Sequence, residues 1–479
     1  MPTAIIGRTL LGLLVALLLA LWTAAPAVAS IAAFAQARMG VGDDTPIATP
    51  AIPDSSAGER LEQILEWING ADIEDHEAIF ADEFLQQVPP SMLGAVRQQL
   101  FDDATVELLR IDAIEQAGDL LRTTVRVDHD DADTEYLSLL VGVDADDRIT
   151  TLLVQPGLGP EGDRPSTWAE LDDALDALPG ELACAAYELV GEPSDIRLAP
   201  VWERRPDRRL ALGSAFKLWV LGAVAEDVAR GERAWDSKVT VRDDQKSLPG
   251  GQMQLEPDGT ELDLRHVATE MIRISDNTAT DHLIRLVGRE EVEAFMSKTG
   301  VDDERNTPFL TTKEMFQVKL GGDMALRDRF AEGGVDEKRA LVAPDGAITA
   351  RTPSMMLASA WLKPIHIDTV EWFASPRELA RVMATLRTME HAHPTGEGIG
   401  HALRQNPGMP FDQETWPVIG FKGGSEPGVL NLTWQLQRDD GRWFCLTFGW
   451  NDTNEPVDMG RLMPLTLAAA QVLGAWDRD

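Results

Sequence analysis

Three short motifs follow one another along this chain, and their side chains are of the kinds that carry out acyl transfer. They are Ser214-Ala215-Phe216-Lys217, Ser275-Asp276-Asn277 and Lys422-Gly423-Gly424. A serine hydroxyl needs a base to become a nucleophile, and a lysine one helical turn away suits that task when burial lowers its pKa. The motifs together therefore predict a serine acyl-transfer site with a nucleophile, a base, a proton relay and an electrostatic clamp.

Each motif also has a simpler interpretation. Ser214 follows a glycine and precedes an apolar helical run, so it fits a plain N-cap. Ser275-Asp276-Asn277 lies between two apolar helical segments, where such residues commonly form a capped turn. Lys422 and its glycines fit the end of a hairpin, although two glycines also let a ligand lie against a strand edge. The order of all three motifs in one chain favours the catalytic interpretation.

In that interpretation Ser214 attacks the substrate and Lys217 accepts its proton. Ser275 relays a proton to the leaving nitrogen, Asn277 hydrogen-bonds Lys217 and a substrate amide, and Lys422 attracts a substrate carboxylate. The predicted catalytic residues are therefore Ser214, Lys217, Ser275 and Lys422, and the predicted substrate-binding residues include Asn277, Gly423 and Gly424.

Two other groups of residues are not expected to take part. Lys298-Thr299-Gly300 resembles the Lys422 motif, but it ends the predicted helix Glu290–Ser297, which makes Gly300 a helix C-cap. His391 and His393 lie in a short segment with no further ligands at a suitable spacing. We therefore expect neither a metal nor another cofactor.

Composition limits the classes of partner. The chain has 479 residues, 44% of them hydrophobic and 25% charged, with a formal net charge of −36. This length predicts two folded domains. The strong negative charge argues against binding to nucleic acid or to anionic membrane surfaces, so a small-molecule substrate is the expected partner.

The N-terminus has the pattern of an export signal. Arg8 is followed by the apolar run Leu10–Trp22 and by the small-residue site Ala27-Val28-Ala29. This predicts a signal peptide over residues 1–29 and a secreted or periplasmic protein. An uncleaved membrane anchor is the alternative, because Thr9–Phe34 contains no charge. Beyond this segment we expect no contact with a membrane.

The rest of the chain divides by composition into four segments. Residues 30–57 and 156–167 are rich in proline and polar residues and are predicted to be linkers. Residues 58–155 show helical patterns followed by strand patterns, which predicts a small α+β domain. Residues 168–479 place strand patterns at both ends of a helical middle, so a second α+β domain is expected there.

Two cysteines occur, and both lie in apolar, strand-like runs. In an exported protein Cys184 and Cys445 could form a disulfide. Two buried free thiols, which behave as small hydrophobic side chains, are the simpler expectation.

The three motifs and the order of the elements resemble the class A β-lactamase family over residues 168–479. The resemblance implies an antiparallel five-stranded sheet flanked by helices, with an all-helical subdomain, and hydrolysis of a β-lactam or related amide or ester through an acyl-enzyme on Ser214. It also implies that the Ser425 amide is a second oxyanion donor. Residues 58–155 resemble NTF2-like accessory domains, and the combination is similar to a serine-hydrolase branch that includes a clavulanic-acid-cluster protein.

Two departures from the family pattern affect the predicted reaction. Gly423 stands where the family usually has threonine, and residues 306–312 contain no glutamate to activate the deacylating water; Glu314 is the nearest candidate. We therefore predict slow deacylation. An ester or cell-wall peptide substrate on the same site, or a non-catalytic peptidoglycan-binding protein, remain as alternatives.

Overall fold

The computed structural model describes residues 51–477 apart from 102–103, 116–119, 130–133, 157–158, 161–163, 248–249, 350–360 and 362. The predicted signal segment and residues 30–50 lie outside this part. The chain forms two compact units, with the main boundary between Pro165 and Ser166; residues Asp458–Ala468, at the start of the last helix, group with the first unit. No helix among the described residues is both long and apolar enough to cross a membrane.

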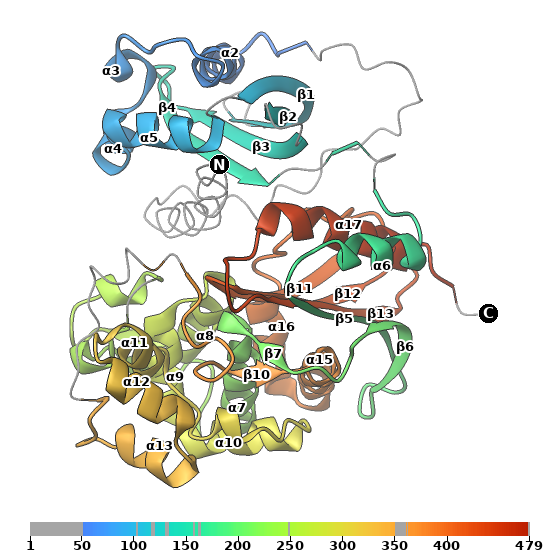
Figure 1. The fold of residues 1–479 in the computed structure, drawn as a ribbon. Helices are drawn as coiled ribbons and strands as arrows, with labels where there is room; N and C mark the ends of the chain where they lie inside the picture. The colour runs from blue at the N-terminus through green and yellow to red at the C-terminus, as the bar shows by residue number, and fades with distance from the viewer. Residues whose placement is uncertain are drawn as a thin grey trace. The chain divides into compact units, whose positions relative to one another are not determined.

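The first unit contains a four-stranded antiparallel sheet with strands in sequence order (Figure 1). The strands are β1 (Ala104–Glu115), β2 (Leu120–His129), β3 (Thr134–Val143) and β4 (Ile149–Pro156), and the helices before them are α2 (Ser56–Ile68), α3 (His76–Ile79), α4 (Asp82–Gln87) and α5 (Pro90–Phe101). Helix α2 begins at Ser55, whose side chain accepts a hydrogen bond from the Gly58 amide. Leu61 and Ile64, one turn apart on α2, are fully buried in the core against the sheet.

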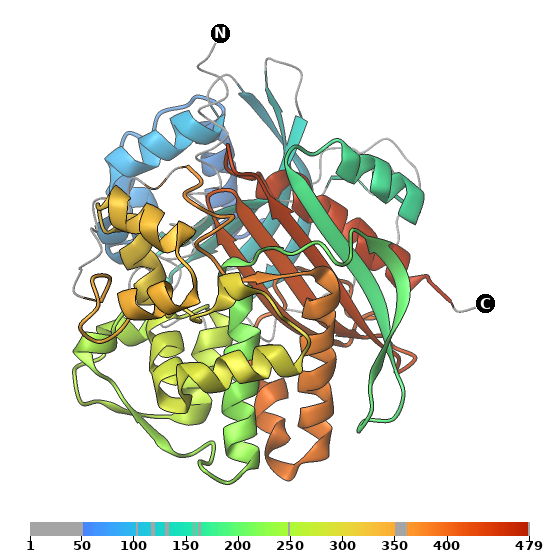
Figure 2. The same cartoon turned by 60° about the horizontal axis from the view of Figure 1, so that its bottom comes forward.

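The second unit contains the predicted five-stranded antiparallel sheet, in the order β11-β12-β13-β5-β6. The strands are β5 (Glu181–Val190), β6 (Arg197–Arg204), β11 (Val418–Glu426), β12 (Val429–Gln437) and β13 (Trp443–Asn451). Figure 2 shows the three C-terminal strands beside β5 and β6, so one sheet joins the two ends of this unit. The predicted α+β fold, with its sheet built from both chain ends around a helical middle, is confirmed.

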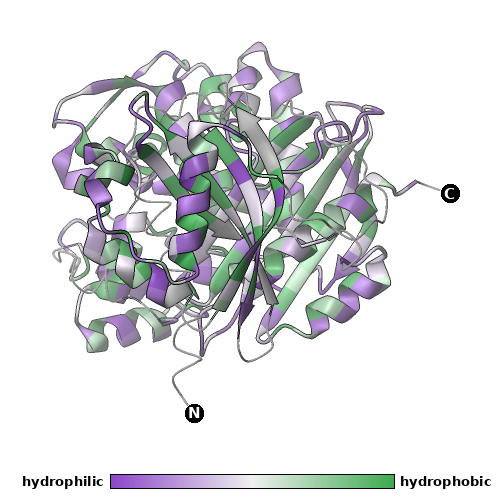
Figure 3. Ribbon diagram, turned by 90° about the horizontal axis from the view of Figure 1, so that it is seen from above, coloured by the Kyte–Doolittle hydropathy of each residue, from purple (hydrophilic) through white to green (hydrophobic). Residues whose placement is uncertain are grey.

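Helices cover this sheet and form the middle of the unit. They are α6 (Trp168–Asp176), α7 (Lys217–Ala229), α8 (Leu264–Arg273), α9 (Asn277–Val287), α10 (Arg289–Lys298), α11 (Thr312–Leu320), α12 (Met324–Glu332), α13 (Val335–Leu341), α15 (Pro376–Ala392), α16 (Glu397–Leu403) and α17 (Met459–Gly474). The helices in Figure 3 carry hydrophilic residues beside hydrophobic ones, as surface helices do. Helix α7 is different, because it is buried nearly all round and is the central helix of the core.

The register of β5 and β13 keeps the two cysteines apart. Cys445 lies opposite Tyr187, and Cys184 lies opposite Phe448. The two cysteines are therefore three positions apart along the paired strands, and their side chains project from opposite faces of the sheet. Both are buried free thiols, as the simpler expectation had it, and burial raises the pKa of Cys184 to about 12.

Candidate active site

Ser214 lies in a 3₁₀ turn, η5 (Gly213–Phe216), that connects β7 (Leu210–Ala211) to α7. The helix itself begins at Lys217, and the residue at its N-cap is Phe216, so the plain N-cap interpretation of Ser214 is wrong. Ser214 is half-buried. Its hydroxyl therefore lies just before the first turn of the central helix, where the backbone N–H groups are not yet paired along the helix.

Glycines bring this turn against the edge strand β11. A Cβ atom at Gly213, whose φ is +50°, would lie 2.7 Å from the Ser425 amide nitrogen. A Cβ atom at Gly424 would overlap the backbone nitrogens of Ser214 and Ala215. Any larger residue at either position would push the two segments apart. The amides of Ser214 and Ser425 thus lie close together, as two donors to one oxyanion must.

Lys217 is fully buried and directs hydrogen bonds to three oxygen atoms. Its Nζ donates to the Ser275 carbonyl at 2.6 Å, to Ser275 Oγ at 3.0 Å and to Asn277 Oδ1 at 2.8 Å. Burial lowers the pKa of Lys217 to about 7, and the charges of Asp276 and Asp281 oppose this shift. A lysine with a pKa near 7 is partly neutral at physiological pH and can act as a general base.

Lys422 approaches the same serine from β11. Its Nζ donates to Ser275 Oγ at 3.1 Å and to the Gly423 carbonyl at 2.6 Å. Burial and the neighbouring Lys217 hold the pKa of Lys422 well below its ordinary value. Ser275 Oγ therefore accepts from both lysines, and this places its hydroxyl between the base and the clamp, where a proton relay belongs.

Asp276 holds the Ser275 turn in place, a role that the motif alone did not indicate. Ser275 has a φ of +61°, a left-handed conformation that costs a non-glycine residue roughly 1–2 kcal/mol. Asp276 is buried and accepts hydrogen bonds from the amides of Ala279, Gln252 and Met253. These bonds attach the start of α9 to the segment that contains Gln252 and Met253. Asp276, the middle residue of the Ser275-Asp276-Asn277 motif, is the N-cap of α9.

All eight predicted site residues thus lie in three segments: the turn and first residue of α7 (214–217), the turn before α9 (275–277) and the second half of β11 (422–425). Gly423 departs from the family for a visible reason: a Cβ atom there would lie 2.7 Å from the tip of the Phe421 ring. That ring stacks on Trp434 with 5.0 Å between the ring centroids. An aromatic pair fills the space beside β11, and a threonine would have to displace it.

Both carboxylate oxygens of Glu314 have partners within the protein. One oxygen accepts from the Thr311 amide at 2.9 Å and closes a capping box at the start of α11. The other pairs with Arg289 at 2.7 Å. With both oxygens committed and the residue 4% exposed, Glu314 stabilises the helix start. These contacts do not favour Glu314, the nearest candidate in the sequence, as the base for deacylation.

A different buried carboxylate, Asp281, acts electrostatically on Lys217 and was not among the residues that the sequence predicted. It accepts from the Thr312 amide at 2.7 Å, from Thr312 Oγ1 at 2.7 Å and from the Lys313 amide at 2.9 Å. Burial raises its pKa to about 6. It lies one helical turn after Asn277 on α9, and this spacing was the available signal. Its contacts attach the start of α11 to α9, beneath the Ser275 turn.

The rejected motif lies elsewhere on the surface. Lys298 ends α10, is 63% exposed and pairs with Glu226. Gly300 has a φ of +86°, in keeping with a residue that follows a helix end. Thr299 accepts a hydrogen bond from the Trp219 ring at 2.8 Å and is part of the core packing. In the described part of the chain no three His, Cys, Asp or Glu side chains gather closely enough to hold a metal ion.

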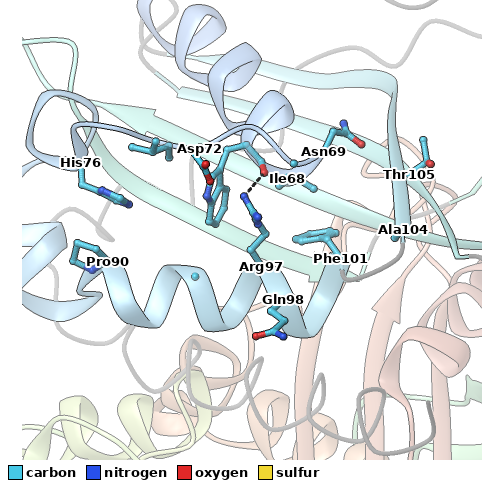
Figure 4. Close-up of a pocket in the computed structure, with 14 residues that line it drawn as sticks. Ile68, Asn69, Asp72, His76, Pro90, Arg97, Gln98, Phe101, Ala104 and Thr105 are labelled. Atoms are coloured by element: carbon cyan, nitrogen blue, oxygen red, sulfur yellow. Dashed lines mark hydrogen bonds between the residues drawn. The ribbon is translucent and has the colours of Figure 1, made fainter. Parts of the chain in front are cut away.

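The first unit has a cavity of about 750 Å³ that contains none of the predicted site residues. Residues of α2, α5 and the start of β1 line it (Figure 4). Arg97 points from α5 toward the end of α2, where it donates to the carbonyls of Trp67 at 3.2 Å and Ala71 at 3.0 Å.

The residues of the three motifs lie together in the second unit, and part of this unit matches a known family. Residues 198–397 match the model of the β-lactamase enzyme family. The matched residues lie within the second unit, which is similar to this family over that range.

Solved structures with a similar fold include two β-lactamases. One, from Sphaerobacter thermophilus DSM 20745, is 21% identical over 66% of this chain and 100% of that chain, with a TM-score of 0.45. The other, from Chitinophaga pinensis DSM 2588, is 15% identical over 64% of this chain and 97% of that chain, with a TM-score of 0.44. No curated protein matches the sequence significantly.

Proposed function

We propose that the protein is a serine hydrolase that forms an acyl-enzyme through Ser214 with a β-lactam or a related amide or ester, and releases it slowly. The observation that carries this proposal is the pair of hydrogen bonds from Lys217 and Lys422 to Ser275 Oγ, at 3.0 and 3.1 Å, beside the Ser214 turn. One hydroxyl in contact with two buried lysines suits proton transfer better than it suits packing, because burying two cationic groups side by side is costly.

In the proposed acylation Lys217, in its neutral form, takes the proton of Ser214 as Oγ bonds to the substrate carbonyl carbon. The amides of Ser214 and Ser425 stabilise the negative oxygen that forms. When the carbon–nitrogen bond breaks, the proton passes from Lys217 through Ser275 to the leaving nitrogen. Lys422 attracts the substrate carboxylate, and the arrival of that negative charge raises the pKa of Lys422 and favours its charged form.

Deacylation has no assigned base among the residues that the structure describes. Residues 306–312 contain no carboxylate, and both oxygens of Glu314 are committed to other contacts. Base catalysis by a positioned side chain is typically worth about 10²–10⁴-fold. The acyl-enzyme should therefore form faster than it breaks.

Incubation with a fluorescent penicillin and with a chromogenic cephalosporin tests the proposal. We expect intact-mass measurements to show one penicillin per chain, and the cephalosporin to give a burst equal to the enzyme concentration followed by slow turnover. Glu314→Gln should leave the burst and the slow phase unchanged.

Other outcomes point to other functions. Fast hydrolysis without a burst, lost in Glu314→Gln, would show that this glutamate is the base after all. Ester hydrolysis without any penicillin adduct would favour the esterase or cell-wall peptide alternative. If neither an adduct nor hydrolysis is detected, the result would favour a non-catalytic peptidoglycan-binding protein.

Replacement of Lys422 by alanine tests the clamp. We expect acylation by a penicillin, which carries a carboxylate, to slow by about 10- to 100-fold more than acylation by a neutral ester, because a charge-assisted hydrogen bond is worth roughly 1.5–3 kcal/mol. Lys298→Ala is the matched control, since it removes the lysine of the rejected motif. Equal losses in both variants, measured by stopped-flow fluorescence, would place the site elsewhere.

A further inference from the structure

Three buried ionisable side chains meet at the end of β11, outside the groups that the proposed mechanism uses. They are Lys319 on α11, Glu371 shortly before β10 (Phe373–Ala374), and Glu426, the last residue of β11. Lys319 Nζ lies 3.2 Å from Glu371 Oε1 and also pairs with Glu426 Oε1. The side chains are 0%, 0% and 5% exposed, respectively. Such burial of charge is costly, so the cluster requires an explanation.

The cluster is connected to the Ser214 turn from two sides. Glu426 directly follows Ser425, and it lies on the same face of β11 as Gly424, whose Cα faces the backbone of Ser214. On the other side, Trp372 directly follows Glu371. The Trp372 carbonyl accepts from the Leu212 amide at 3.0 Å, and its ring stacks on Phe216 at 3.7 Å.

The protonation of the cluster follows from its contacts. Glu426 Oε2 is buried with no hydrogen-bond partner among the described residues, so a negative charge on Glu426 would be poorly stabilised. Burial and the nearby Glu371 carboxylate raise the pKa of Glu426 well above its ordinary value, against the opposing effect of Lys319. With Glu426 neutral and Lys319 paired with Glu371, the cluster carries no net charge.

We propose that Lys319, Glu371 and Glu426 form a buried cluster that holds the end of β11, and with it the Ser425 amide, beside the Ser214 turn. These are positioning residues for acylation, and this role rests on the proposed function. An edge strand has only one neighbouring strand to fix it. The cluster supplies a second attachment, to α11 and to the segment that packs on the serine turn.

Two shape-conserving variants of the full-length protein separate this role from ordinary packing. Glu426→Gln keeps a neutral side chain of the same size, so the acylation rate at pH 7 should stay within about twofold of wild type. Glu371→Gln removes one of the two carboxyl partners of Lys319 and leaves Glu426 as the other, which should lower the acylation rate at least about tenfold while the substrate concentration for half-maximal rate changes little. Acylation is measured with the fluorescent penicillin under single-turnover conditions, at a temperature where every variant is folded.

The pH dependence provides the second readout. A group whose folded pKa is raised stabilises the folded state at low pH, and this contribution is lost as the pH rises from about 4.5 through the folded pKa. Wild type should therefore lose thermal stability, relative to Glu426→Gln, as the pH rises from about 4.5 toward the folded pKa of Glu426, and the ratio of its acylation rate to that of Glu426→Gln should fall once the pH passes that folded pKa. The charged groups that act on Glu426 are Glu371 and Lys319.

Asp227→Asn is the control for simple loss of an ion pair whose carboxylate is largely buried. The Asp227 side chain is 7% exposed, pairs with the partly exposed Arg230 and Arg233, and lies ten residues along α7 from Lys217, about 15 Å. It should lower thermal stability without changing the acylation rate of the folded protein.

Equal effects of Glu426→Gln and Glu371→Gln, or identical pH profiles for wild type and Glu426→Gln, would overturn the proposal. If wild type forms no adduct, the proposed function fails, and the thermal-stability profiles still decide whether the cluster is neutral as described.

Discussion

Replacement of Ser214 by alanine is expected to abolish every covalent adduct with penicillin while leaving the fold intact. The change removes one oxygen atom from a half-buried residue that caps neither the 3₁₀ turn nor α7, so little stability should be lost. Without the attacking oxygen no acyl bond can form. The measurement is intact mass after prolonged incubation, with thermal unfolding in parallel.

The matched control is Ser237→Ala, which removes a serine hydroxyl that accepts from the Ala234 amide before β8 (Lys238–Thr240). This variant should be labelled as fully as wild type. A penicillin adduct that persists on the Ser214→Ala protein would assign the nucleophile to another residue and would remove the basis of the proposed mechanism.

Replacement of Lys217 by alanine is expected to slow acylation by at least about 10³-fold, because a nucleophile and its base act as one unit. Lys217→Arg should be almost as slow, although it keeps a positive charge, since a guanidinium does not give up its proton in proteins. The comparison separates the loss of a base from the loss of a charge.

The pH profile supplies an independent check of the same residue. The neutral amine is the active form of a base, and the pKa of Lys217 is lowered to about 7. The acylation rate of wild type should therefore rise between about pH 6 and pH 8 and then level off, before any decline at higher pH. A rate independent of pH across this range, or normal acylation by Lys217→Ala, would make Lys217 a structural residue.

The two lysines also explain why the site needs its buried acids. Lys217 and Lys422 both donate to Ser275 Oγ, and each is buried, so their charges disfavour one another. The negative charges of Asp276 and Asp281 raise the pKa of Lys217, against the effect of burial. Neither carboxylate accepts one of the three hydrogen bonds that Lys217 donates. The pKa of the base is thus set by burial and is moderated by two carboxylates whose first task is to hold backbone amides.

Local pattern was sufficient for part of this protein. The strands of the four-stranded and five-stranded sheets and the three motifs were predictable, because strand alternation and glycines beside a strand are features of neighbouring residues. The rejection of Lys298-Thr299-Gly300 was likewise local, since a helix that ends in glycine is visible in the sequence. The fold class follows from these same patterns.

The remaining decisions depended on contacts between residues far apart in the chain. Glu314 pairs with Arg289 and Asp281 binds the start of α11, and no spacing rule could assign those partners. The cluster of Lys319, Glu371 and Glu426 joins three separate segments. Burial sets the pKa of each such group, and burial is a property of the packed chain. The sequence by itself therefore determined which side chains could carry out acyl transfer, and the tertiary structure decided which carboxylates are committed elsewhere, because only packing determines where each charge is buried and paired.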